Sequence, residues 1–171
     1  MHNSFLRTIS VLLFASGGLL PFSSSLAGTL TIAKKVPFEK GIHVPDAVRA
    51  ECALEQKVSD YVREAASGQH EVKVADSVSA KTLGKALGMT ITAVLAPGGG
   101  SWSGPKSVTV RGTLWENGKQ TGSFTARRHT SGGGGTCGML ARDAKEIGKD
   151  IAKWLASPGQ DDKLGDAKKS K

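Results

Sequence analysis

Alternating apolar residues in the middle of the chain constrain the fold more than any other feature. Three segments, residues 87–95, 107–115 and 120–129, are rich in β-branched residues and alternate between apolar and polar positions. A period of two is typical of strands that bury one face. Asn117 and Gly118, between the last two segments, are a strong signal for a two-residue hairpin turn. These features predict an antiparallel meander of three strands.

Two segments with helical periodicity flank this meander. Residues 47–67 follow Asp46, a candidate N-cap, and repeat apolar side chains along one helical face. Residues 138–156 show the same three- and four-residue steps and stop before Pro158, which cannot continue a helix. Each segment therefore predicts an amphipathic helix that packs one face against the sheet.

The order of elements predicts the fold class. A strand at residues 28–36 precedes the first helix, and a short strand at residues 72–75 follows it. This order predicts an α+β fold: a two-layer domain with a mainly antiparallel sheet of four or five strands and two helices packed on one face. We expect this single domain to span residues 28–156. Residues 157–171 have almost no apolar content, which predicts a disordered polar tail.

The first 27 residues have the layout of a secretory signal peptide. A basic Arg7 precedes a short apolar run, residues 8–20, and small residues lead to Ala27, the expected cleavage site. The run is shorter than the roughly 20 residues that cross a bilayer, so we expect no transmembrane segment in the mature form. The predicted location is the periplasm or the outside of the cell.

The two cysteines have two interpretations. In an oxidising compartment an even pair predicts a disulfide, here Cys52–Cys137. Closing so long a loop would stabilise the fold by about 4 kcal/mol. Alternatively, Cys137 lies at a predicted helix N-terminus, which favours a thiolate, and His129 could act as its base. The disulfide would exclude this thiol-hydrolase alternative.

Trp102 is one candidate binding residue. It lies in a glycine-rich loop, residues 97–105, between two predicted strands. An exposed tryptophan often marks a binding surface. The alternative is that Trp102 folds back as a lid over the core. The net charge of +8 could favour an anionic partner such as lipid, lipopolysaccharide, nucleic acid or an acidic protein. Because the charges are spread along the chain, the alternative is an ordinary solvated basic surface. The predicted partner is an envelope protein or an anionic envelope component.

Arg127, Arg128 and His129 form a second candidate. They precede the glycines 132–135 and a predicted helix start, so guanidinium groups and free backbone amides could together hold a small anion. Neighbouring strand residues point to opposite faces, so Arg127 and Arg128 converge only if the strand bulges. Without a bulge, both are ordinary solvated residues.

Other sites are excluded by spacing. Gly99 and Gly104 have the separation of a phosphate-binding loop, but Pro105 replaces the required lysine and a strand follows, so no nucleotide is expected. The histidines His43, His70 and His129 lack the spacing of zinc ligands. We therefore expect no metal and no cofactor, and an enzymatic role is disfavoured.

Residues 87–154 resemble a known family. A β segment, the loop APGGGSWSGPKS, the strands VTVRGTLWENGK and GSFTARRHTSGG, and a helix ending in DIAKWL resemble small exported proteins of Gram-negative bacteria. The pattern is also similar to DUF4410-type envelope domains. The resemblance implies an envelope-associated accessory module and assigns no residue a chemical role. The leading hypothesis is a non-enzymatic exported binding domain that uses the Trp102 loop and nearby strands.

Overall fold

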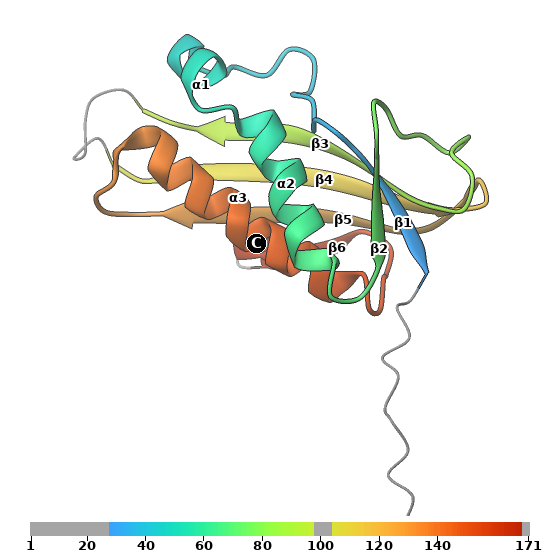
Figure 1. The fold of residues 1–171 in the computed structure, drawn as a ribbon. Coiled ribbons are helices and arrows are strands. Elements are labelled where there is room, and N and C mark those ends of the chain that lie inside the picture. The colour runs from blue at the N-terminus through green and yellow to red at the C-terminus, as the bar shows by residue number, and fades with distance from the viewer. Residues whose placement is uncertain (1–27, 98–103, 169–171) are drawn as a thin grey trace, which may run out of the picture.

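Six strands form one sheet, and the helices pack against one of its faces (Figure 1). The computed structural model describes residues 28–97 and 104–168. The elements are β1 (Thr29–Ala33), α1 (Asp46–Glu51), α2 (Leu54–Ala66), β2 (Glu71–Ala75), β3 (Lys85–Leu95), β4 (Lys106–Glu116), β5 (Lys119–Thr130), α3 (Gly135–Trp154), β6 (Asp162–Gly165) and the 3-10 helix η1 (Asp166–Lys168).

The sheet is mixed, with the strand order β2-β1-β3-β4-β5-β6. The predicted meander is present: β3, β4 and β5 pair antiparallel, and Asn117 and Gly118 turn the β4–β5 hairpin with φ values of 51° and 85°. β1 instead pairs parallel with both β2 and β3, and β6 pairs parallel with β5. The predicted mainly antiparallel sheet of four or five strands is therefore wrong at both edges, where helices connect strands that run in the same direction.

The predicted helix over residues 47–67 is two helices. α1 and α2 meet at Ala53, whose left-handed backbone (φ 48°) interrupts the helical path. Asp46 is the first residue of α1 and not its cap, because Pro45 occupies the N-cap position. The helices therefore number three among the described residues, where two were predicted.

The C-terminal segment is ordered up to Lys168, so the predicted disordered tail is wrong over residues 157–168. β6 extends the sheet beside β5 and buries Leu164, and η1 buries Ala167. The indole Nε1 of Trp154 donates to Asp162 Oδ2 at 2.8 Å, which fixes the turn between α3 and β6. Two apolar side chains and a few specific hydrogen bonds thus order a segment whose composition is polar.

The core lies between the sheet and the helices α2 and α3. Its largest fully buried apolar side chains come from strands and helices alike: Leu30, Ile32, Leu54, Leu87, Ile91, Leu114, Leu140, Ile147 and Ile151. Phe124 of β5 and Trp154 of α3 meet edge to face, with ring centroids 4.8 Å apart. In the part of the chain that the structure describes, no helix packs on the opposite side of the sheet.

Candidate binding surface

The predicted disulfide is confirmed. Cys52, at the end of α1, bonds to Cys137, in the first turn of α3, with Cα atoms 4.9 Å apart. A disulfide suggests an oxidising, non-cytoplasmic compartment. No free cysteine is left in the chain, so the alternative thiol hydrolase lacks its nucleophile.

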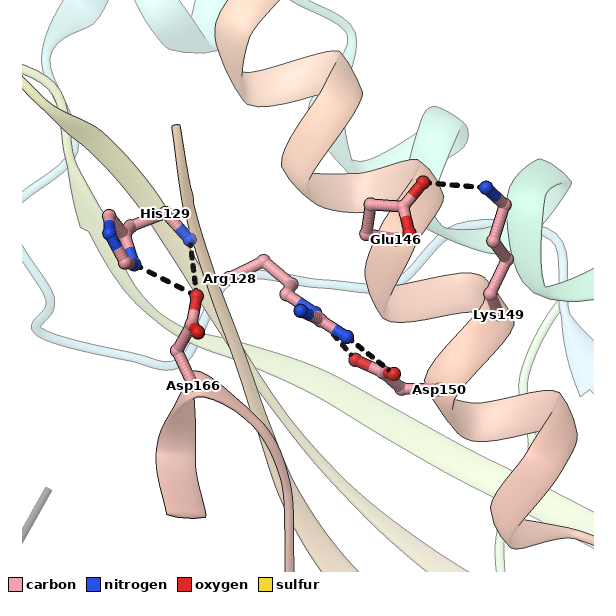
Figure 2. Close-up of polar contacts among 6 residues, drawn as sticks. All are labelled: Arg128, His129, Glu146, Lys149, Asp150 and Asp166. Atoms are coloured by element: carbon pink, nitrogen blue, oxygen red, sulfur yellow. Dashed lines mark hydrogen bonds and ion pairs between the residues drawn. The ribbon is translucent and has the colours of Figure 1, made fainter. Parts of the chain in front are cut away.

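Two of the three predicted basic residues bind carboxylate groups within the chain. Figure 2 shows Arg128 reaching from β5 to Asp150 of α3. Its Nε and Nη2 atoms each donate to one carboxylate oxygen at 2.7 Å. This hydrogen-bonded carboxylate raises the pKa of Arg128 above its ordinary value. His129 is paired with Asp166 of η1, through its ring Nδ1 at 2.8 Å and its backbone amide at 3.2 Å.

A second ion pair lies on the exposed side of α3, beside this network. The Lys149 ammonium binds the Glu146 carboxylate at 2.6 Å (Figure 2), and this contact lowers the pKa of Glu146. Both side chains are about half exposed, so the pair contributes little to stability.

Arg127 does not join Arg128. Its side chain leaves β5 on the face away from the helices, because consecutive strand residues point to opposite faces. The irregularity in the β4–β5 register lies at Leu114 and Trp115, far from these arginines. The structure therefore does not bring Arg127, Arg128 and His129 together as one anion site.

The glycine segment before α3 is already bonded within the chain. Arg142 of α3 donates to the Gly133 carbonyl oxygen. Trp102 lies outside the described residues. The buried Lys106 ammonium donates to the carbonyl of Pro97 at 2.9 Å.

The side of the sheet that faces away from α2 and α3, here called the outer face, carries hydroxyl groups and cations. Alternate residues of the central strands lie in rows across it. One row places Arg111 of β4 between Thr90 of β3 and Thr125 of β5, with Lys163 of β6 next to Thr125. The adjacent rows contain Gly88, Thr113 and Ser123 on one side, and Ala93, Thr109, Arg127 and Gly165 on the other.

Arg111, Arg127 and Lys163 form a cation cluster on the outer face. Arg127 is the diagonal neighbour of Arg111, a separation of about 7–8 Å between backbones. Neither guanidinium has an ion-pair partner within residues 28–97 and 104–168. The Lys163 ammonium lies 3.4 Å from the Thr125 hydroxyl. Neighbouring unpaired cations repel one another, so this cluster attracts anions and contributes no stability of its own.

The outer face is hollowed where the cation cluster lies. One hollow of about 470 Å³ is lined by Trp115, Thr90, Arg111 and neighbouring residues, and its walls include Lys35 and Asp76. A second hollow of about 420 Å³ extends to β6. Both are lined by Arg111, Gly112 and Thr113. Together they form a groove across the strands, here called the outer groove, with Arg111 at its centre.

Trp115 lies at one end of the outer groove. Its indole ring covers Gly88 on the neighbouring strand, because a Cβ atom at Gly88 would lie 2.6 Å from the ring carbon Cζ3. Glycine is therefore required beneath the tryptophan. At the other end, the Asp161 carboxylate accepts a hydrogen bond from the Ser123 hydroxyl at 3.0 Å.

The sequence analysis did not single out Arg111, Lys163 or Trp115, which the structure places along the outer groove. The signal was available for β4, because Arg111 and Trp115 alternate with Val110 and Leu114, which are buried. No signal placed Lys163 beside them, because residues 157–171 were predicted to be disordered.

The described residues contain neither a group placed to bind a metal ion nor a helix suited to cross a membrane. Among the described residues, no group of three His, Cys, Asp or Glu side chains is placed to hold a metal ion. No helix in these ranges combines the length and apolar character needed to cross a bilayer.

Comparisons with known proteins give structural likenesses only. No protein-family model matches the sequence, and no curated protein matches it. A dodecamer of a PelC variant from Paraburkholderia phytofirmans aligns at 17% identity and a TM-score of 0.46, over 72% of this chain and 85% of that one. A second PelC dodecamer from that organism gives 14% and 0.45, over 71% and 86%. A homolog of neuraminyllactose-binding hemagglutinin from Helicobacter pylori gives 10% and 0.37, over 85% and 90%. Likenesses at this level say nothing about what the chain binds, and the resemblance to DUF4410-type domains stays a prediction.

Proposed function

We propose that this protein is a non-enzymatic, exported binding domain of the cell envelope, periplasmic or secreted, and that its outer face binds an anionic envelope component. One observation carries the proposal: Arg111, Arg127 and Lys163 gather on the side of the sheet that no described helix covers. The Cys52–Cys137 disulfide supports an oxidising compartment.

The cation cluster is better explained by a ligand than by folding. Cations on opposing strands without carboxylates between them destabilise a sheet, as like charges do. A bound carboxylate or phosphate reverses this effect, because a guanidinium presents two parallel N–H donors to it. The contrast with Arg128, whose two donors are occupied by Asp150, identifies Arg111 and Arg127 as the available groups.

Binding to anionic probes tests the proposal. The mature chain, with its disulfide intact, is titrated with polygalacturonate, polyphosphate and vesicles containing phosphatidylglycerol. We expect at least one probe to bind, and the double variant Arg111→Gln/Arg127→Gln to lower that affinity by about tenfold or more, because each charged hydrogen bond contributes about 1.5–3 kcal/mol.

A matched control removes the same charge from the helical side. Lys145 and Lys153 are exposed on α3, so Lys145→Gln/Lys153→Gln changes the net charge equally without touching the outer face. We expect this variant to bind like the wild type. Equal loss in both double variants would indicate attraction by net charge alone and would overturn the proposal. The variant Trp102→Ala tests the loop that the sequence analysis favoured. If Trp102→Ala loses affinity for the probe and Arg111→Gln/Arg127→Gln does not, the binding site lies in that loop.

A further inference from the structure

The outer groove has the features of a site for a chain of linked, hydroxyl-rich units. Its floor carries the hydroxyls of Thr90 and Thr113 in the first hollow, and those of Ser123 and Thr125 in the second. Such groups both donate and accept hydrogen bonds. In the second hollow the Ser123 hydroxyl is bonded to Asp161 and the Thr125 hydroxyl to Lys163. A ligand with many neutral hydroxyls would thus find its partners mainly at Thr90 and Thr113, whereas a simple anion would use the cations only.

Trp115 supplies an apolar surface at one end of the groove. Its ring is held against the backbone of β3, over Gly88, and is half-buried there while it lines the first hollow. An aromatic ring with a fixed position loses little conformational entropy when it binds and offers a flat apolar contact area. The carbon-bound hydrogens of a sugar ring present a complementary apolar face.

The spacing of these groups suits an extended ligand. Trp115 and Arg111 lie four residues apart on β4, and Lys163 lies two strands away on β6. Strands are about 4.8 Å apart, so the part of the groove from β3 to β6 spans about 14 Å. That length accommodates several linked units, with an apolar contact at one end and cations at the centre and the far end.

We infer that the outer groove binds an acidic glycan, a polysaccharide that carries carboxylate groups, with a sugar ring against Trp115 and a carboxylate at Arg111. This inference rests on the proposed function, because it names the class of anion that the outer face binds. The hydroxyl-rich floor and Trp115 add recognition that charge alone does not provide.

Other occupants fit the groove less well. A second copy of this chain, seated face to face, would bring two cation clusters together. A nucleic acid strand is usually bound through several stacked aromatic residues, and Trp115 is the only aromatic side chain of the outer face that lines the first hollow. A lipid surface is flat, whereas Arg111 lies where two hollows meet.

Calorimetric titration with oligogalacturonate tests the inference. We expect the mature protein to bind this carboxylated glycan, and to bind its methyl-esterified form about tenfold more weakly, because esterification removes the charge and keeps the sugar rings. Trp115→Ala is expected to weaken binding of oligogalacturonate by about tenfold and to leave binding of polyphosphate unchanged. Trp115→Phe should restore part of the affinity.

A second variant covers the case in which Trp115→Ala fails to fold. Thr113→Val/Thr125→Val removes two hydroxyls with little change in side-chain shape and is expected to weaken only the binding of the glycan.

The outcomes separate the two proposals. If polyphosphate binds through Arg111 and Arg127 and oligogalacturonate does not, the glycan inference is overturned and the proposed function stands. If the esterified and acidic glycans bind equally, or if both variants bind the glycan like the wild type, the glycan inference also fails. If no anion binds, both proposals fall.

Discussion

Arg127 and Arg128 are consecutive residues of β5, and their surroundings differ completely. Arg128 points to the helical face, where its side chain is 31% exposed and its guanidinium binds the Asp150 carboxylate through two hydrogen bonds. Arg127 points to the outer face, beside Arg111 and Lys163, without an ion pair among the described residues. On the helical face the charge of Arg128 is balanced by the Asp150 carboxylate. On the outer face no carboxylate among the described residues pairs with Arg127, and the proposed anion would do so.

This comparison yields a general expectation. Changes on the helical face should alter the free energy of unfolding, whereas changes on the outer face should alter binding and leave stability nearly unchanged. Three measurements of stability test this expectation.

Removing the disulfide should have the largest effect. The bond closes a loop with a sequence separation of 85 residues and joins the end of α1 to α3. The chain-entropy argument predicts that Cys52→Ala/Cys137→Ala lowers the free energy of unfolding by about 4 kcal/mol. Urea denaturation of the variant and of the oxidised wild type measures the difference. At temperatures where the variant is folded, anion binding should be retained, since the disulfide does not line the outer groove. A loss of binding in the folded variant would contradict the separation of the two faces.

The neighbouring arginines provide the sharpest test. Arg128→Gln leaves the mostly buried Asp150 carboxylate without its partner and should lower the free energy of unfolding by about 2 kcal/mol. Arg127→Gln, the matched control one residue away, should change it by less than about 0.5 kcal/mol. Equal effects in denaturant titrations would mean that position in the strand, and not pairing, determines the role of each arginine.

Asp143 should show a smaller effect that depends on pH. Its side chain lies on α3, is 1% exposed, and accepts a hydrogen bond from the Thr130 hydroxyl. Burial raises the pKa of Asp143 above its ordinary value, because the charged form is poorly solvated. The folded state therefore binds this proton more tightly than the unfolded state does. The contribution of Asp143 to stability is fully present below its ordinary pKa of about 4 and is lost as the pH rises through the folded value.

Replacing Asp143 by asparagine removes this titration. We expect Asp143→Asn to gain stability relative to the wild type as the pH rises from about 3 to 7, because only the wild type loses the contribution of the protonated carboxyl. Thermal unfolding of both proteins across this range measures the difference. A constant difference at every pH would show that the Asp143 carboxyl is not perturbed by the fold.

The sequence predicted the regions where local patterns are strong. The meander, the turn at Asn117 and Gly118, and the helical periodicity of α2 and α3 depend on residues close together in the chain, and the structure has them. The Cys52–Cys137 disulfide was predictable because the chain has only two cysteines.

The predictions that failed concern features that depend on contacts between distant segments of the chain. The parallel edge strands β1, β2 and β6 depend on how the connecting helices return the chain, which periodicity does not encode. β6 has a single large apolar residue, Leu164. This side chain is buried because β6 pairs with β5. The binding surface was missed for the same reason: Arg111 and Lys163 become neighbours only once β6 is placed on the sheet.

The shortness of β6 has a consequence for how copies of this protein behave at high concentration. β6 has four residues; it follows Asp161 and ends at Gly165, and both of these residues have left-handed backbones (φ 54° and 58°). Such a short edge strand offers few unpaired backbone groups with which a strand from another molecule could pair. It also covers part of β5, which has twelve residues. A chain cut before Asp161 would uncover that longer margin, and self-association into aggregates is the expected result.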